Sequence, residues 1–181
     1  MATLIKERRI VADSWHLFKR GPKGELPEVP ARGDVIIPLA LWLARREELL
    51  SRAETGTLGV WVDANEGPEA FAGDVQRFPL IAVNFPKFGD GRGYSIARLL
   101  RERYGFKGEL RAIGDVLRDL LYFMEQCGFD AFALREDQDP QESLAAFHDF
   151  SDGYQTSVPR PAPLFRRRLG AGRQGSPWPR E

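Results

Sequence analysis

At 181 residues the chain is long enough for one full-sized domain and short for two, and its 43% apolar and 29% charged residues are ordinary for a soluble globular protein. Lysine plus arginine equals aspartate plus glutamate, so no overall charge favours binding to nucleic acid or to an anionic membrane. A single cysteine excludes an intramolecular disulfide and a cysteine-ligated cluster built from this chain alone.

The charges are distributed unevenly along the chain. From Ser157 onward there are six arginines against one acidic residue, Glu181, so this segment carries a formal charge of +5 and the remainder −5. The segment is also rich in proline and glycine, which predicts a disordered basic tail over residues 157–181. Because no apolar run is long enough to span a membrane and the N-terminal residues do not have the charged-then-apolar pattern of a leader, we expect a cytoplasmic protein.

From residue 34 onward, short apolar runs alternate with longer segments of helical periodicity. The apolar runs, which predict strands, are residues 35–37, TLGVWV at 57–62, LIAVNF at 80–85, residues 109–113 and residues 131–134. The segments predicted to be helical begin at Pro38 and then cover residues 67–78 (weakly), 94–104, 115–127 and 141–150. The segment 115–127 is the clearest, because its apolar side chains share one face and Gly128 follows it.

This alternation predicts an α/β fold with an open, mainly parallel sheet, helices on both faces and five βα units. Part of a βα-barrel is the alternative, since a complete barrel normally needs about 250 residues. The N-terminal segment RRIVADSWHLF predicts an antiparallel ribbon at one edge of the sheet. The expected organisation is therefore an edge ribbon and linker over residues 1–33, an α/β domain over 34–156 and the tail over 157–181.

Polar side chains follow the predicted strands, and the carboxyl ends of parallel strands meet at one rim of a sheet, where ligands bind. The residues expected at this rim are Asp63, Asn65, Asn84, Lys87, Asp90, Arg92, Asp115, Arg118, Asp119, Arg135, Glu136 and Asp137. Such a mixture of both charges with amides suits a small polar or anionic ligand. For Asp115, a helix N-cap is the alternative role.

The loop FPKFGDGRGYS is the most distinctive part of this rim. Its glycines permit positive φ and close approach by a ligand, and the start of the following helix favours anions. We therefore predict binding of sulfite, sulfate or phosphate by Lys87, Gly89, Gly91, Arg92, Gly93, Arg98 and Arg118. The glycine spacing is neither a dinucleotide fingerprint nor a P-loop, so no motif indicates a cofactor.

The groups available for acid–base catalysis are Asp90, Asp115, Asp119 and Lys87. No metal site is predicted, because His16 and His148 lie far apart in the sequence without ligand spacing. Cys127 lies on the apolar face at the C-terminal end of a predicted helix, where the dipole disfavours a thiolate. We expect it to be a buried structural cysteine.

The residues from Phe85 to Phe132 resemble a bacterial family of unknown function. The motifs that carry the resemblance are FPKFxDGRGYS, LRxxxGFxGELRAxGDVLRD and CGFDxF, with looser similarity from Val35 to Tyr154. Members of this family carry an oxidoreductase label linked to sulfite reduction and are typically encoded beside assimilatory sulfite reductase. The family usually has a small hydroxylated residue where this chain has Gly89, so a contact from that side chain is not essential here.

The resemblance implies a place in sulfur assimilation, with sulfite reductase as the partner. Three functions are compatible with it. The first is an accessory protein of sulfite reduction that binds a small oxyanion or a partner at the rim. The second is an enzyme of undefined reaction, an oxidoreductase by its family label, that uses Asp, Lys and Arg side chains of the same rim. The third is a non-catalytic assembly subunit that docks on the reductase through its arginine-rich tail.

Overall fold

A computed structural model describes residues 3–150 and 153–171. The fold is mixed α/β. Its strands are β1 (Thr3–Lys6), β2 (Arg9–Ala12), β3 (His16–Leu17), β4 (Val35–Pro38), β5 (Leu58–Val62), β6 (Leu80–Phe85), β7 (Glu109–Gly114) and β8 (Ala131–Phe132). Its helices are α1 (Leu39–Ala44), α2 (Arg46–Glu54), α3 (Arg92–Glu102), α4 (Leu121–Gln126), α5 (Pro140–Ser143) and α6 (Leu164–Ala171), with 3₁₀ turns η1 (Pro68–Phe71), η2 (Val75–Arg77), η3 (Arg118–Leu120) and η4 (Leu144–His148).

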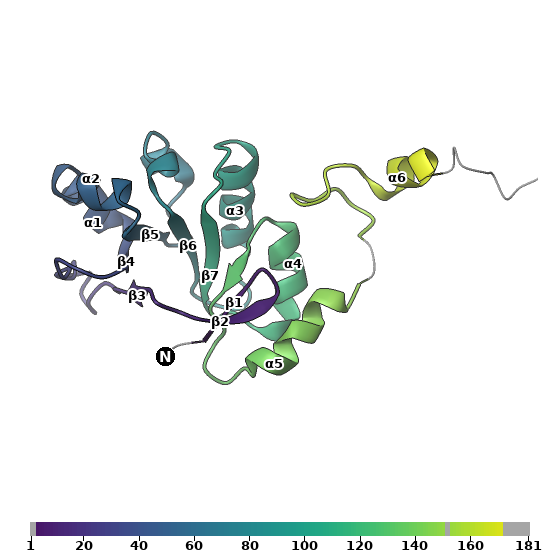
Figure 1. Ribbon diagram of the computed structural model, residues 1–181, viewed down its shortest axis with the longest axis horizontal. Helices are drawn as coiled ribbons and strands as arrows, with labels where there is room; N and C mark the ends of the chain where they lie inside the picture. The colour runs from purple at the N-terminus through teal and green to yellow at the C-terminus, as the bar shows by residue number, and fades with distance from the viewer. Residues whose placement is uncertain (1–2, 151–152, 172–181) are drawn as a thin grey trace, which may run out of the picture.

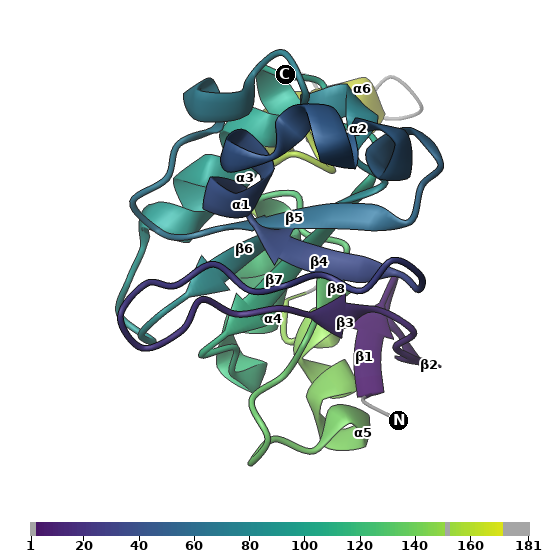
Figure 2. The ribbon, with the colours of Figure 1, turned by 90° about the vertical axis from the view of Figure 1, so that its left-hand side faces the viewer.

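In the described residues all eight strands form one sheet, in the order β2-β1-β8-β7-β6-β5-β4-β3. Strands β3 to β8 are parallel and neighbour one another in chain order, whereas β1 pairs antiparallel with both β2 and β8. The sheet curls into half of a barrel (Figures 1 and 2). The expected mixed α/β class is therefore confirmed, in the curled form that was the alternative expectation.

The helices pack on one face of this sheet only, which corrects the expectation of helices on both faces. The large buried cluster joins that face of the strands to the apolar side chains of the helices, among them Trp42, Leu100 and Met124. The opposite face carries a small cluster of strand residues with Trp15 and Ala133, and no helix residue of the described chain belongs to it. The reason is the strand order, because crossovers of one handedness between successive neighbours place every helix on the same side.

Two predicted helices differ from the structure. The crossover from β5 to β6 contains only the 3₁₀ turns η1 and η2 in place of an α-helix, so the count of five βα units is not confirmed. The helix predicted from Asp115 begins at η3 and becomes α-helical only at Leu121, because Gly114 has a φ of 93° and the Asp115 N–H donates to the carbonyl of Phe85. Asp115 is therefore not an N-cap of α4.

The N-terminal segment contributes strands to both edges of the sheet. The antiparallel hairpin β1–β2 covers β8 at one edge and begins before the predicted ribbon, whereas β3 crosses to the other edge and pairs parallel with β4 (Figure 1). In the segment predicted to be a disordered tail, residues 164–171 form α6, which lies apart from the sheet in Figure 1. Residues 172–181 lie outside the described residues.

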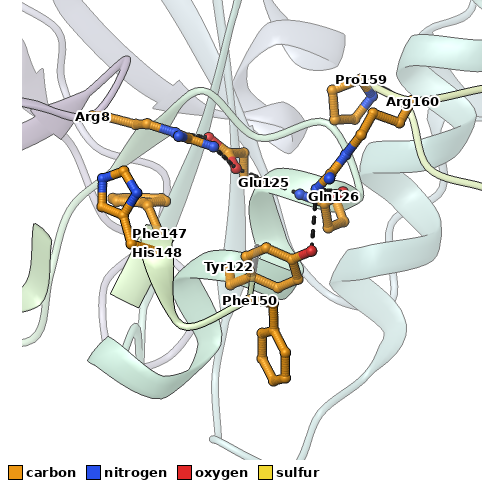
Figure 3. Close-up of a pocket in the computed structure, with 9 residues that line it drawn as sticks. All are labelled: Arg8, Tyr122, Glu125, Gln126, Phe147, His148, Phe150, Pro159 and Arg160. Atoms are coloured by element: carbon orange, nitrogen blue, oxygen red, sulfur yellow. Dashed lines mark hydrogen bonds and ion pairs between the residues drawn. The ribbon is translucent and has the colours of Figure 1, made fainter. Parts of the chain in front are cut away.

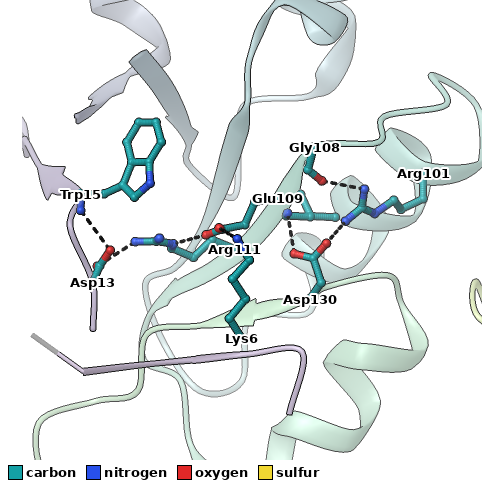
Figure 4. A network of polar contacts seen from close by, with 9 residues as sticks. Lys6, Asp13, Trp15, Arg101, Gly108, Glu109, Arg111 and Asp130 are labelled. Carbon is teal, nitrogen blue, oxygen red and sulfur yellow. Dashed lines mark hydrogen bonds and ion pairs between the residues drawn. The ribbon is translucent and has the colours of Figure 1, made fainter. Parts of the chain in front are cut away.

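A polar network anchors the N-terminal segment to the middle of the sheet (Figure 4). Arg111 on β7 is only 2% exposed, and its guanidinium bonds Asp13 at 2.8 Å and Glu109 at 2.7 Å. Glu109 also bonds the ammonium of Lys6 on β1 at 2.7 Å. A buried guanidinium is stable only when it is paired, so these contacts hold residues 6–13 against β7.

Candidate functional site

A cavity of about 630 Å³ lies at the carboxyl ends of the parallel strands. The residues that line it come from β3, β5, β6 and β7 and from the segments that follow β3, β5 and β8. They are Leu17, Lys19, Arg20, Trp61, Asp63, Asn84, Ile113, Gly114, Ala133, Leu134, Arg135 and Glu136. Ligands bind at this end of the strands in α/β sheets and βα-barrels, because polar loop residues converge there above a rigid apolar floor.

The floor of the cavity is fixed by contacts between neighbouring strands. Asp63 follows β5, and its Oδ1 accepts from the side-chain amide of Asn84 at 3.1 Å and from the N–H of Ala64 at 2.9 Å. Gly114, at the end of β7, lies very close to the end of β6. A Cβ on Gly114 would be 2.6 Å from the side-chain oxygen of Asn84 and 2.4 Å from the carbonyl oxygen of Phe85. With its φ of 93°, this position accepts only glycine, which leaves room for the Asn84 amide.

Arg20 covers one side of the cavity. Its guanidinium lies over the ring of Trp61, 5.3 Å from the centroid, and donates to Glu66. Trp61 in turn donates its indole N–H to the carbonyl of Phe18 at 2.9 Å, which fixes the ring. The Nε of Arg20 is buried and has no hydrogen-bond partner in the described part of the chain. The neighbouring Lys19 is exposed and makes no ion pair within residues 3–150 and 153–171.

Arg135 forms the opposite side and is bound to two carboxylates. It donates to Asp115 at 2.7 Å and to both oxygens of Asp137 at 2.6 and 2.7 Å. These hydrogen bonds, to Asp137 first and then to Asp115, raise the pKa of Arg135, and those to Asp137 hold the pKa of that carboxyl below its usual value. The other oxygen of Asp115 accepts from the N–H of Phe88 at 2.7 Å, so Asp115 ties the loop after β6 to the loop after β8.

The glycine-rich loop lies beside this cavity and does not line it. Its Asp90 carboxylate accepts from Arg92 three times, at 2.9 Å from Nε, 2.6 Å from Nη2 and 3.2 Å from the backbone N–H. The hydrogen bonds from Arg92 lower the pKa of Asp90 to about 2. The chain's own carboxylate therefore occupies the N-terminus of α3, where an external anion was predicted.

The loop glycines do not have the backbone conformation that the sequence analysis allowed for. None of Gly89, Gly91 and Gly93 has a positive φ. A Cβ at Gly93 would lie 2.7 Å from the Cζ of Phe85, so glycine is needed there for packing. At Gly89 and Gly91 a Cβ would meet nothing within 4 Å.

The remaining predicted anion-binding and catalytic residues are placed away from the cavity. Arg98 bonds Glu102 one turn further along α3 at 2.9 Å, and Arg118 bonds Asp119 and Asp149 at 3.2 Å each. Lys87 is exposed and forms no ion pair with any described residue. Among the four catalytic candidates, Asp115 alone bonds a residue that lines the cavity, namely Arg135.

The sequence interpretation placed Asp63, Asn84, Arg135 and Glu136 correctly at the rim but missed the residues that come from the N-terminal segment. Lys19 and Arg20 follow β3, a strand of two residues that the sequence assigned to an antiparallel ribbon. Trp61 was treated only as part of a buried strand. The signal that could have found it is its position two residues before Asp63, because side chains at that spacing point to the same face of a strand.

A second cavity, of about 440 Å³, lies on the helix side of the sheet, between the β1–β2 turn, α4 and residues 159–160 (Figure 3). Its polar groups bond one another. Arg8 forms a bidentate ion pair with Glu125 at 2.7 and 2.8 Å, and Arg160 donates to the Tyr122 hydroxyl and to Gln126. The cavity at the strand ends is the better candidate site, because a buried donor of one of its lining residues, the Nε of Arg20, has no acceptor in the part of the chain that the structure describes.

Residues 59–165, more than half of the chain, match the protein family described as "Bacterial protein of unknown function (DUF934)". The chain belongs to this family. The match includes β5 to β8 and the loops that follow them, whereas Leu17, Lys19 and Arg20 lie outside it. No curated protein matches the chain, and no solved structure does.

The described residues contain no group of three or more His, Cys, Asp or Glu side chains that could hold a metal ion. No helix among them is both long and apolar enough to cross a bilayer.

Proposed function

We propose that this protein binds a small anionic molecule in the strand-end cavity and acts as an accessory protein of sulfite reduction. The observation that carries the proposal is Arg20, a residue that lines a cavity of about 630 Å³ and whose buried Nε has no acceptor among residues 3–150 and 153–171. Buried donors are nearly always paired in folded proteins, so an unpaired one beside a cavity favours a ligand that supplies an acceptor.

Charge and size define the ligand further. Lys19 supplies a second cation that no described carboxylate neutralises, and hydrogen bonds from charged donors to oxyanions are among the strong ones. The cavity volume is in the range of about 300–1,000 Å³ that is typical of sites for metabolite-sized ligands. A free sulfite or sulfate would fill only a small part of it, so an oxyanion attached to an organic molecule fits better.

The sulfur context comes from the family resemblance of residues 85–132, and with it sulfite reductase as the partner. Within that context the geometry favours binding over acid–base catalysis by the predicted carboxylates. Asp90 is a weak base because Arg92 lowers its pKa to about 2, and Asp115 is engaged by Arg135 and by the Phe88 N–H.

The binding site can be tested by calorimetry with 2-hydroxyethanesulfonate, sulfite and sulfate at constant ionic strength. We expect the organic sulfonate to bind, and Lys19→Ala to weaken it about tenfold because a charge-assisted bond is lost. Lys107→Ala is the matched control, since Lys107 is equally exposed but precedes β7 at the opposite end of the strands. Absence of binding by all three anions, or equal effects of the two variants, would refute the site.

The place in metabolism needs a separate test in cells. We expect a strain that lacks the protein to grow slowly with sulfate as the only sulfur source and normally with cysteine. The gene for the wild-type chain should restore growth on sulfate, and the gene for the Lys19→Ala variant should not. Equal growth of the deletion strain on both sulfur sources would refute the role in sulfite reduction while leaving the binding result intact.

A second candidate function, docking on the reductase, is supported by α6. Phe165 and Leu169 lie one turn apart on this helix and are 53% and 72% exposed, with arginines between them. Apolar side chains at this spacing suit insertion into a groove of another protein. If α6 is the contact, the double variant Phe165→Ser/Leu169→Ser should no longer co-purify with sulfite reductase, and retained co-purification would exclude it.

A further inference from the structure

Two carboxylates line the strand-end cavity together with the cations. Asp63 is half-buried, and only one of its oxygens, Oδ1, accepts hydrogen bonds within residues 3–150 and 153–171. Glu136 is exposed, and it makes no ion pair in the same part of the chain. Arg92 forms its hydrogen bonds with Asp90, and these are the main cause of the raised pKa of Arg92. The charge of Asp63 makes a smaller contribution in the same direction.

Two of the three cations that line the cavity already bond carboxylates of the chain, so fewer are available to bind an anionic ligand. Arg135 already bonds Asp115 and Asp137, and the terminal nitrogen of Arg20 already bonds Glu66. Of the charged groups that line the cavity, those that form no ion pair with any described residue are therefore one cation, Lys19, and two anions, Asp63 and Glu136. A bare dianion would meet the two unpaired carboxylates, and like charges at short range repel.

A ligand that carries both a negative and a positive charge would pair with the unpaired cation and with the unpaired carboxylates of the cavity. Its acid group would accept from Lys19 and Arg20, and a cationic group would donate to Asp63 and Glu136. Between these polar groups the lining is apolar, with Trp61, Ile113 and Leu134. Such a surface accommodates a short carbon skeleton that joins the two charged ends.

We infer that the ligand of the strand-end cavity is a small acid that also bears an ammonium group, of the amino acid or aminosulfonate class. The inference rests on the proposed function, because it assigns the class of molecule that the same cavity binds. Asp63 is the residue that recognises the ammonium group, since Asn84 and the Ala64 N–H hold its carboxylate in place at the floor.

The test compares 2-aminoethanesulfonate with 2-hydroxyethanesulfonate, which have the same sulfonate on the same two-carbon chain and differ in the amine. By calorimetry on the full-length protein at neutral pH, we expect the aminosulfonate to bind about tenfold tighter, as one added charge-assisted hydrogen bond implies. The preference should disappear when the pH is raised above the pKa of the amine.

Two variants identify the residue responsible. Asp63→Asn keeps the size of the side chain and an acceptor for Asn84, and it should bring the affinities of the two sulfonates together. Glu142→Gln removes the same charge from the exposed face of α5, outside the cavity, and should leave the preference unchanged. Lys19→Ala should weaken both sulfonates equally, because it acts on the acid group that they share.

The outcomes separate this inference from the proposal on which it rests. If the hydroxysulfonate binds as tightly as the aminosulfonate, the ammonium group is not recognised and the inference is wrong, while anion binding in the cavity stands. Likewise, a preference that survives in Asp63→Asn overturns the role of Asp63. If neither sulfonate binds, both the proposed function and the inference fail.

Discussion

Gly93 shows how a missing side chain can decide the packing at the start of a helix. The ring of Phe85 lies where the Cβ of any larger residue would be, at 2.7 Å from its Cζ. That ring cannot move away easily, because it is buried and packs against Tyr94 and Phe129, with centroids 5.1 and 5.7 Å away. The first turn of α3 is thereby held against β6.

We predict that Gly93→Ala destabilises the protein by about 1–2 kcal/mol, since the cost of overpacking exceeds the gain in helix propensity. Gly89→Ala, in the same loop, should change the free energy of unfolding by less than about 0.5 kcal/mol because its Cβ meets nothing within 4 Å. Urea unfolding followed by tryptophan fluorescence measures both. Equal effects of the two substitutions would contradict the packing role of Gly93.

Cys127 is buried at the end of α4, as the sequence predicted. Burial raises the pKa of its thiol to about 11, with a smaller opposing effect of Arg98. The thiolate is the reactive form, so the native protein should react with a disulfide reagent such as Ellman's at a small fraction of the rate of the protein unfolded in urea. The rate should rise as the pH approaches the raised pKa. Rapid reaction of the native protein at neutral pH would contradict this.

The glycine-rich loop also shows the limit of interpreting residue types singly. Glycine permits both positive φ and close packing, and the two uses cannot be distinguished from the letter alone. The sequence interpretation chose the first for Gly93, and the structure has the second. Similarly, the charges of Asp90 and Arg92 indicated a polar site, but their spacing did not reveal that they neutralise each other.

At the scale of elements, Asp74 joins α1 and α2 to the crossover between β5 and β6. Its carboxylate accepts from the indole of Trp42 at 3.1 Å, from Arg46 at 2.7 and 2.8 Å and from Arg77 at 3.1 Å. Asp74 itself is only 6% exposed. The 3₁₀ turns η1 and η2 are too short to form the continuous backbone hydrogen bonds of an α-helix. The side-chain hydrogen bonds of Asp74 therefore help to hold this crossover against α1 and α2.

Asp74→Ala should destabilise the protein by about 3 kcal/mol, because it leaves the buried indole N–H of Trp42 without its acceptor and removes one of two carboxylate partners from each of Arg46 and Arg77. Asp119→Ala, at a side chain that is 80% exposed, should cost less than about 0.5 kcal/mol. Urea unfolding at neutral pH measures both variants, and similar losses would contradict the structural role of Asp74.

The carboxylate of Asp74 also makes the free energy of unfolding depend on pH. The pKa of Asp74 lies below its ordinary value of 3.8, and the largest cause is the hydrogen bonds that Arg46 donates to its carboxylate. The stability that the ionised carboxylate contributes is therefore fully present well above pH 3.8, begins to fall as the carboxyl of the unfolded chain protonates around that pH, and is lost as the pH falls through the lowered pKa. The difference between wild type and Asp74→Ala should accordingly be constant from neutral pH to about pH 5 and shrink below that.

Most elements could be predicted from the sequence because burial leaves a periodic pattern. The runs LIAVNF and VWV are strands, as their continuous apolar character indicated, and α3 lies where its apolar spacing placed it. The start of the helix after β7 could not be predicted, because it depends on a backbone hydrogen bond from Asp115 to Phe85 across two strands. Such a contact exists only once the sheet has formed.

At the scale of the whole molecule, the N-terminal 17 residues hold both edges of the sheet. They supply Leu4 and Ile5 to the core, and they place Asp13 against the buried guanidinium of Arg111. The sequence showed a ribbon at one edge, but not which edge strand it joins, since strand order depends on the crossovers rather than on any local pattern. For the same reason the contribution of Lys19 and Arg20 to the cavity was missed.

We predict that a chain without residues 1–17 has no cooperative thermal transition and no near-UV circular dichroism typical of packed aromatics. In the full-length chain, Asp13→Ala should lower the free energy of unfolding by about 2 kcal/mol, because the guanidinium of Arg111 keeps only Glu109 as an ion-pair partner. A truncated chain that melts cooperatively at the wild-type temperature would show that residues 34 onward fold alone.

The antiparallel pairing of β1 with β8 has a consequence for how the protein is made. Ile5 lies opposite Phe132 in this pair, so β1 joins a strand that is synthesised much later. At a synthesis rate of about 5–20 residues per second, β1 waits on the order of ten seconds for its neighbour. During that interval the apolar side chains of Leu4 and Ile5 cannot be buried against β8, and a chaperone that binds this segment of the nascent chain would shield them from aggregation.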